Sequence, residues 1–273
     1  MGQMVTVVGW NVDGWHTISD AQLGLLDDTG TQLVLAQEVT PASLERLREA
    51  GWQATASLEP VDDGHVERAG VRPRFGCAVL ARGSVRLGAA QVLADAPSPV
   101  RTLGVDVDVA GQPAHVVSAA LPPGSMWGRK AKVGQARHLA GHLRGRPGPT
   151  IVGIDRNGPK LERWDPHETV WWREDDPDLF APGAVHGLTD VLLTLYAQQP
   201  DQRDRARRER PDGPLEVSYV ERRANPPVPR RYDLLLASRH WTVHEVTYDY
   251  EGAVAAGSDH AVVRACLELD DSS

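Results

Sequence analysis

Five segments of this 273-residue sequence place acidic, amide or imidazole side chains beside apolar, strand-like runs. They are residues 10–14, 36–39, 153–157, 231–234 and 257–260. An unpaired charge is costly to bury, so carboxylates at the ends of buried strands need partners. Carboxylates that several strand ends bring to one rim form an oxygen-rich pocket, and oxygen ligands suit hard cations. These segments therefore predict a divalent-cation site with Mg²⁺ or Mn²⁺ as the cofactor.

Strand-like and helix-like patterns alternate along the chain and would position these segments. The predicted strands are short apolar runs at 5–11, 33–37, 76–81, 102–109, 115–121, 150–154, 217–220, 232–237, 242–248 and 260–267. The predicted helices are residues 18–26, 41–50, 129–144 and 188–196. Thr40 is the expected N-cap of the second helix, with Pro41 in its first turn and Gly51 after its end. In 129–144, apolar residues recur at helical spacing, with basic residues expected on the opposite face.

Many strands with few helices between them predict the fold class α/β. We expect a four-layered sandwich, in which two mainly antiparallel sheets pack face to face and the helices lie outside. No linker separates two parts of the chain, so residues 1–273 are expected to form one domain. The segment 201–231 contains nine arginines and a proline-rich stretch, and we interpret it as a long loop with the short strand 217–220 inside it.

The composition is that of an ordinary globular protein, with 41% hydrophobic and 24% charged residues. The sequence has neither an apolar run long enough for a transmembrane helix nor a leader-like start, so we expect a cytoplasmic monomer without membrane partners. Cys77 and Cys266 lie in apolar runs, as buried thiols of a reducing compartment do. The net charge of −8 argues against a non-specific DNA coat protein. It does not exclude a nuclease, because a bound cation supplies the positive field for phosphate.

In this order the five segments resemble the signature motifs of the endonuclease/exonuclease/phosphatase superfamily. That group includes deoxyribonucleases, abasic-site endonucleases, inositol polyphosphate 5-phosphatases and neutral sphingomyelinases. The resemblance runs from Gly9 to Val262, and the segment 11–14 is most similar to the exonuclease III-like abasic-site branch. It implies a deoxyribonuclease I-like fold and a metal-dependent phosphoric ester hydrolase.

The resemblance also implies a metal site. Glu38 would be the main ligand, and Asp13, Asn11 and Asp259 would lie near the ion, directly or through water.

Four further residues carry the catalytic roles that the resemblance implies. Asp155 would deprotonate or orient the attacking water, and Asn157 would hold a phosphate oxygen. His260 would contact the scissile phosphate, and Asp233 would orient the imidazole, as a carboxylate commonly does.

Each of these residues also has a purely structural interpretation. Asp13 fits an Asp-Gly turn, and Asp233 fits an ion pair with an adjacent arginine. The remaining alternatives are a strand-end cap for Asn11, a surface carboxylate for Glu38, turn formation for Asp155 and Asn157, and a core position for His260.

The sequence departs from the family pattern in two places. Members place a histidine or tyrosine at the end of the strand after the hairpin, where this chain has Ala120, which cannot hydrogen-bond a phosphate. Trp127, Arg129 and His138 follow closely and are candidates to supply that contact. The usual Gly-Asp-x-Asn has become Gly-Ile-Asp-Arg-Asn at 153–157, which leaves Asp155 and Asn157 in their i, i+2 relation.

The arginine-rich segment and a tryptophan pair are candidates for substrate binding. Arginine pairs bidentately with phosphate and indole rings stack on bases, so this group comprises Arg203, Arg205, Arg207, Arg208, Trp171 and Trp172. The structural alternative is a solvated loop balanced by its own acidic residues, with the tryptophans packed in loops.

Three functions follow from these features. The first is a phosphodiesterase that acts on nucleic acid, most simply an endonuclease. The second is a phosphatase or phosphodiesterase of small phosphorylated metabolites or lipid headgroups. The third is a non-catalytic binding module of the same fold, which the alanine at 120 supports and the otherwise complete residue set opposes.

Overall fold

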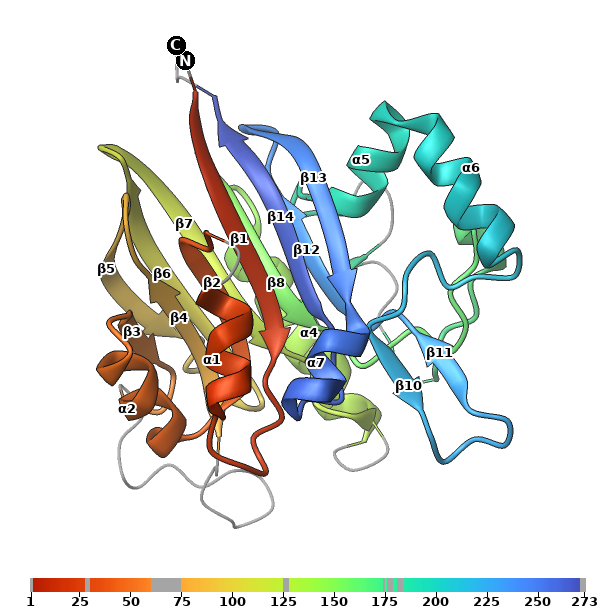
Figure 1. Cartoon of the computed structure of the whole chain (residues 1–273), viewed down its shortest axis with the longest axis horizontal. Helices are drawn as coiled ribbons and strands as arrows, with labels where there is room; N and C mark the ends of the chain where they lie inside the picture. Colours follow the sequence, from red (N-terminus) through yellow and green to blue (C-terminus); the bar gives the residue numbers. More distant parts are fainter. Residues whose placement is uncertain are drawn as a thin grey trace.

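Two six-stranded sheets, packed face to face, form the centre of the molecule (Figure 1). The computed structural model describes residues 2–27, 30–59, 75–124, 128–173, 175, 179–180 and 184–270. In spatial order the first sheet contains β13(Trp241–Asp249), β14(Val262–Leu269), β1(Gln3–Asn11), β2(Leu33–Val39), β4(Gly76–Ala81) and β3(Gln53–Ala56). The second contains β5(Val85–Val92), β6(Thr102–Val109), β7(Gln112–Ala120), β8(Thr150–Asp155), β12(Asp233–Ala237) and β9(Thr189–Asp190).

Each sheet is antiparallel except for one central parallel pair. These pairs are β1 with β2 in the first sheet and β7 with β8 in the second. The predicted pair of mainly antiparallel sheets is therefore confirmed. Parallel neighbours end at the same edge of a sheet, so both parallel pairs bring their carboxyl ends toward a common rim.

Helices cover the outer faces and complete the four layers. In Figure 1, α1(Asp20–Asp27), α2(Pro41–Glu49) and α7(Tyr250–Ala256) lie on the side of the first sheet. The helix α4(Arg129–Leu143) packs its buried residues against β7, β8 and β12 of the second sheet. None of the described helices is long and apolar enough to cross a membrane. The Thr40 hydroxyl accepts from the Ser43 amide, so the predicted cap of α2 is confirmed.

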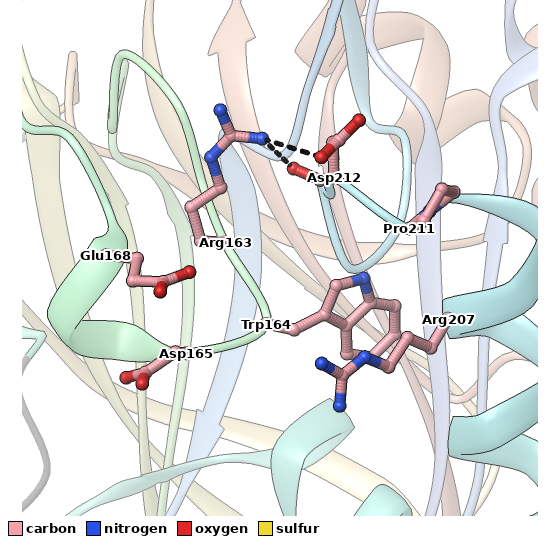
Figure 2. Close-up of a pocket in the computed structure, with 7 residues that line it drawn as sticks. All are labelled: Arg163, Trp164, Asp165, Glu168, Arg207, Pro211 and Asp212. Atoms are coloured by element: carbon pink, nitrogen blue, oxygen red, sulfur yellow. Dashed lines mark hydrogen bonds and ion pairs between the residues drawn. The ribbon is translucent and has the colours of Figure 1, made fainter.

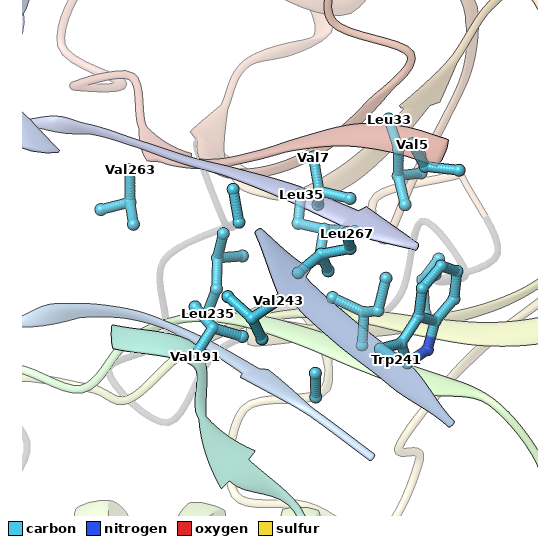
Figure 3. Packing of buried hydrophobic residues seen from close by; sticks show 14 of the residues in the cluster. Val5, Val7, Leu33, Leu35, Val191, Leu235, Trp241, Val243, Val263 and Leu267 are labelled. Carbon is cyan, nitrogen blue, oxygen red and sulfur yellow. The ribbon is translucent and has the colours of Figure 1, made fainter. Parts of the chain in front are cut away.

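The central core lies between the sheets, and alternation along each strand builds it. In β1, Val5 and Val7 point between the sheets, whereas Val8 and Trp10 face the helices. Figure 3 shows Val5 and Val7 beside residues of β2, β12 and β14 in this inner layer. Strands with both faces covered are almost wholly apolar, which is why their ends stood out in the sequence.

The arginine-rich segment is not the long loop that we expected. Residues Pro200–Glu209 form α6, and β10(Tyr219–Glu221) pairs with β11(Val228–Arg230) in a separate ribbon. Pro200 starts the helix, Asp201 lies in its first turn, and basic residues fill its last turn, as the helix dipole favours. Only Ala206 of α6 is buried, so the helix lacks the apolar stripe by which a sequence pattern is recognised.

Other elements carried too weak a pattern to be predicted. The structure adds β3, β5, β9, α7 and the short 3₁₀ helices η1(Pro99–Arg101) and η2(Pro166–Glu168), and it limits the last predicted helix to α5(Val191–Gln198). Cys77 is buried as expected, whereas Cys266 is only partly buried. In α4, Lys132 is buried rather than solvent-facing.

Candidate active site

The predicted catalytic residues meet at one edge of the sandwich. Asn11 ends β1, Asp155 ends β8, and Asp233 begins β12 directly opposite Asp155 in the ladder. His260 lies just before β14, and Glu38 lies one residue before the end of β2. The site residues thus come from the ends of β1, β2, β8 and β12 and from the segment just before β14. Strands of two packed sheets hold these residues in a rigid arrangement.

Two glycines allow the sheets to approach closely beneath this edge. Gly9 and Gly153 each lie two residues before a site residue and face the opposite sheet. A Cβ added to Gly153 would lie 2.6 Å from Cβ of Leu35, so only glycine fits there. The close approach brings Asn11 of one sheet into hydrogen-bonding contact with Asp155 of the other, at 3.2 Å between Nδ2 and Oδ2.

The Asp155 carboxylate is the hub of the site. It accepts hydrogen bonds from the Asn11 amide, from the Asn157 amide group at 3.0 Å and from the Asn157 backbone N–H at 3.0 Å. Burial raises the pKa of Asp155 to about 6, and the charge of Asp233 adds to this, although the nearby imidazole of His260 opposes it. A buried carboxyl with a pKa near neutrality is suited to accept and release a proton.

A turn with left-handed backbone aims Asn157 at Asp155. Its φ is 50°, a conformation that asparagine tolerates better than most residues. Lys132 of α4 donates to the carbonyl oxygen of Asn157 at 2.7 Å and is ion-paired with Asp175. Asp175 in turn accepts from the backbone N–H of Trp172 at 2.9 Å. A buried ion pair therefore holds the turn, and this explains why Lys132 departs from the predicted basic outer face.

His260 and Asp233 form a buried pair. The imidazole Nδ1 lies 2.8 Å from Oδ2 of Asp233. Burial lowers the pKa of His260, but the Asp233 carboxylate outweighs burial and raises that pKa well above its ordinary value. The Ser218 hydroxyl accepts from the Asp233 backbone N–H at 3.0 Å, and the Tyr248 hydroxyl donates to the Asp233 carbonyl oxygen at 3.1 Å. The pair is thus fixed in orientation, and the Asp233 carboxylate favours the protonated form of the imidazole.

The arginines next to Asp233 have other partners. Arg231 pairs with Glu162 at 2.7 Å and with Asp190 at 2.8 Å, and Arg156 also pairs with Glu162, at 2.9 Å. The structural alternative in which Asp233 pairs with an adjacent arginine is therefore wrong. Arg156 directly follows Asp155, and Arg231 lies two residues before Asp233. These buried ion pairs therefore support the two strand ends that carry the carboxylates.

Asn11 also contacts the segments that carry the predicted metal ligands, at Asp13, Glu38 and Ser258. Glu38 accepts from the Gly14 N–H at 3.4 Å, and both Asp13 and Glu38 have φ of 59°. Burial raises the pKa of Glu38, while Arg101 and His260 oppose the rise. Burial also raises the pKa of Asp13, and the charge of Asp259 adds to it. The Asp13 and Asp259 carboxylates repel each other, whereas the charges that act on Glu38 are positive.

One group of the described residues has ligand atoms close enough to share a metal ion. Single ligand atoms of Asp155, Asp233 and His260 lie within 4.8 Å of one another, all in buried side chains. In this group His260 Nδ1 and Asp233 Oδ2 are 2.8 Å apart. Among the described residues the predicted ligands Glu38, Asp13 and Asp259 do not form a group of this kind.

Sequence reasoning missed two residues of the site. Arg101, in η1, is buried and lies close enough for its charge to lower the pKa of Glu38. Tyr219, at the start of β10, packs its ring against His260 with the centroids 5.0 Å apart. Neither residue borders a strand-end motif, so no local pattern marked them.

Ala120 occupies the end of β7 as predicted. It lies opposite Asp155 in the β7–β8 ladder, is 2% exposed and is part of the central core. Of its possible substitutes, Arg129 and His138 are exposed on α4, with His138 Nδ1 bonded to the Gly134 carbonyl at 2.8 Å. Trp127 lies outside the described residues.

The two tryptophans are both partly buried and both have a cationic group over the ring. Trp171 stacks on Phe180 with centroids 6.3 Å apart, and the guanidinium of Arg156 lies 5.8 Å from its ring. Trp172 has Nζ of Lys160 at 5.4 Å and the guanidinium of Arg230 at 5.9 Å. These contacts favour the loop-packing interpretation for both rings.

The arginines of α6 lie apart from the catalytic constellation. In Figure 1, α6 lies at the side of the molecule, away from the ends of β1 and β8. All four predicted substrate-binding arginines of this helix are exposed. Figure 2 shows Arg207 at a cavity of ≈ 400 Å³, facing Arg163 and Asp165 across it. None of the catalytic or metal-site residues lines that cavity.

No family model and no curated protein matches this sequence. Solved structures do share its fold. TDP2 from D. rerio, crystallised with a single-strand DNA product, has a TM-score of 0.63 and 16% identity, covering 97% of this chain and 98% of that one. The human nocturnin catalytic domain with a bound sulfate has a TM-score of 0.62 and 15% identity, covering 98% and 96%. An endonuclease/exonuclease/phosphatase from Beutenbergia cavernae has a TM-score of 0.62 and 19% identity, covering 98% and 72%. At these identities the likeness concerns the fold, and this chain has the α/β-sandwich fold of the endonuclease/exonuclease/phosphatase proteins, as its motifs implied.

Proposed function

We propose that this protein is a divalent-metal-dependent phosphodiesterase that cleaves nucleic acid. The observation that carries the proposal is the hydrogen-bonded constellation of Asp155, Asn157, Asp233 and His260 at one edge of the sandwich, beside Glu38. A non-catalytic module would not need a carboxyl of raised pKa facing a fixed imidazolium. The fold likeness to TDP2 with a single-strand DNA product and to nocturnin with a bound sulfate supports an anionic substrate.

In the proposed reaction Asp155 accepts a proton from the attacking water. Asn11 and Asn157 hold the carboxylate in place, since both amides donate to its Oδ2. His260, kept positive and oriented by Asp233, faces the phosphoryl group and stabilises the negative charge that develops on it. The same protonated ring is a source of the proton that the leaving oxygen needs.

The residues around Glu38 fit a hard divalent cation. Glu38, Asp13 and Asp259 provide carboxylate oxygens, and the Asn11 oxygen, which accepts from the Asp13 N–H at 3.1 Å, keeps a second lone pair. Mg²⁺ or Mn²⁺ bound there would supply positive charge for the phosphoryl oxygens and the leaving oxygen. We further propose that the chain works as one catalytic domain, as a monomer, in the cytoplasm.

Hydrolysis of a substrate panel tests the function. Single-stranded DNA, duplex DNA with an abasic site, RNA, phosphomonoesters and lipid headgroup diesters would each be incubated with Mg²⁺, with Mn²⁺ and with EDTA. We expect cleavage of a nucleic acid that depends on the cation. If only small phosphoesters were cleaved, the protein would instead be a phosphatase or phosphodiesterase of small metabolites. Unchanged cleavage in EDTA would refute the metal requirement.

Glu38→Gln is expected to weaken Mg²⁺ or Mn²⁺ binding by at least about tenfold, because even residues that only support metal ligands contribute about 10- to 100-fold. The variant should fold normally, since an amide of the same shape replaces the carboxylate. Calorimetric titration with Mn²⁺ and the Mg²⁺ dependence of cleavage measure the effect. Glu45→Gln, on the exposed surface of α2, is the matched control. Equal metal affinity in both variants would exclude Glu38 as a ligand.

The arginines of α6 are proposed as a secondary contact for long nucleic-acid strands. Replacing Arg203, Arg205, Arg207 and Arg208 with Gln should then weaken binding and reduce the slope of log affinity against log salt by up to about 3 for a single strand. Fluorescence anisotropy of a labelled oligonucleotide at several salt concentrations measures the slope. Lys130→Gln with Arg144→Gln, exposed on α4, provides a comparison. An unchanged slope in the α6 variant would leave that helix as a solvated surface.

A further inference from the structure

Tyr219 occupies a position at the active site that none of the five motifs explains. It begins β10, and a bridge pairs it with His260. The backbone N–H of Ala261 donates to the carbonyl of neighbouring Ser218 at 2.7 Å. The hydroxyl of Ser218 also accepts from the backbone of Asp233. Tyr219 is thus anchored to the same two segments that hold the His260–Asp233 pair.

The ring of Tyr219 contacts two other rings. It is stacked on Tyr232, with centroids 5.3 Å apart and an angle of 16° between the rings. It also contacts the His260 imidazole, with centroids 5.0 Å apart and an angle of 36°. Such stacking leaves little freedom of rotation, so the direction of the hydroxyl is set by the site.

The hydroxyl of Tyr219 is available to a ligand. Within the part of the chain that the structure describes, no residue forms a hydrogen bond with it, and the side chain is only half-buried. Burial raises the pKa of Tyr219, and the charges of Asp259, Glu221 and Asp155 raise it further. The phenol therefore stays protonated, and two of the three carboxylates that act on it belong to the active site.

The two sides of the Asp155 strand end differ in the donors that they offer. On one side Ala120 ends β7, and its methyl group, buried in the core, cannot donate a hydrogen bond. On the other side β12 begins with Asp233, which holds His260. The Tyr219 phenol lies beside His260 and adds a second donor group on that side.

We propose that the Tyr219 hydroxyl donates a hydrogen bond to a non-bridging oxygen of a phosphoryl group bound beside His260. The inference rests on the proposed function, because it places a phosphoryl group at this edge. The alternative role is packing alone, in which the ring supports the imidazole and the hydroxyl does nothing.

Tyr219→Phe separates these roles, since it keeps the stacked ring and removes only the hydroxyl. We expect kcat/KM on the cleaved nucleic acid to fall by about 10- to 100-fold, the effect of one hydrogen bond to a charged group. Tyr196→Phe in α5 is the control. It removes a hydroxyl that donates to Glu216 at 2.9 Å, and it should retain normal turnover. Tyr219→Ala should lose more than Tyr219→Phe, because the ring is lost as well.

Binding of inorganic phosphate in the presence of Mg²⁺ gives a second measurement that needs no turnover. Calorimetry should show weaker phosphate binding for Tyr219→Phe than for the unaltered protein. If Tyr219→Phe matches the unaltered protein in both turnover and phosphate affinity, the hydroxyl has no substrate role and the proposal is wrong. If the unaltered protein binds phosphate through Tyr219 but cleaves no phosphodiester, the proposed function fails and the contact stands.

Discussion

Asp155→Asn is expected to lower kcat by about 10²- to 10⁴-fold, the contribution of a general base. The amide has nearly the shape of the carboxylate, but it cannot take a proton from water. Asn11 and Asn157 both donate to Oδ2 and the Asn157 backbone N–H donates to Oδ1, so the NH2 group of the new side chain would face a donor at either position. Metal affinity should change little, because Glu38 and Asp13 are untouched. Single-turnover cleavage with saturating Mg²⁺ measures the chemical step apart from binding.

The control for this variant is Asp106→Asn, which alters an exposed carboxylate paired with His115 at 2.8 Å, far along β6 from the edge. It should cleave at the normal rate. Near-normal single-turnover cleavage by Asp155→Asn, with an unchanged melting temperature, would show that another group activates the water. The reaction would then rest on the cation alone.

His260→Ala is expected to reduce kcat by about 10²- to 10³-fold, as the removal of one donor to a developing oxyanion does. Asp233→Asn should produce a smaller loss, because it leaves the imidazole in place but removes the carboxylate that raises the pKa of His260. The double variant should lose little more than His260→Ala, since Asp233 acts through the imidazole. The four cleavage rates, measured at one pH, form the cycle.

Folding must be checked in this cycle, because both side chains are buried. His260→Gln, a polar side chain that keeps more of the volume, is the second variant for that purpose. Multiplicative losses in the double variant would contradict the pairing and indicate that Asp233 and His260 act separately. A loss for Asp233→Asn larger than that for His260→Ala would indicate that Asp233 itself contacts the cation or the substrate.

The strand ends and the fold were accessible from the sequence for one physical reason. Central strands covered on both faces are continuous apolar runs, and a carboxylate or amide at the end of such a run is conspicuous. Asn11, Asp155 and Asp233 each end or begin a strand of this kind. The number of strands, together with the family that these segments resemble, predicted the α/β sandwich, which the structure confirms.

In the arginine-rich region the sequence pattern did not predict the helix α6. The sequence of α6 has one apolar residue that becomes buried, Ala206, so periodicity could not distinguish a solvated helix from a loop. For Lys132 the sequence pattern predicted the wrong environment. Its charge predicted a solvent-facing position, but Asp175, 43 residues later, neutralises it inside the protein.

Burial on both faces of a strand leaves a local pattern, so the side chains that end the central strands can be identified from the sequence. What those side chains contact depends on the tertiary structure. The sheets approach at Gly9 and Gly153, which brings Asn11 to Asp155 across 144 residues. The strand pattern at 217–220 indicated part of the ribbon that carries Tyr219, but not that its ring contacts His260. Contacts between distant segments depend on the packing of whole sheets, and packing is a property of the assembled chain rather than of any window along it.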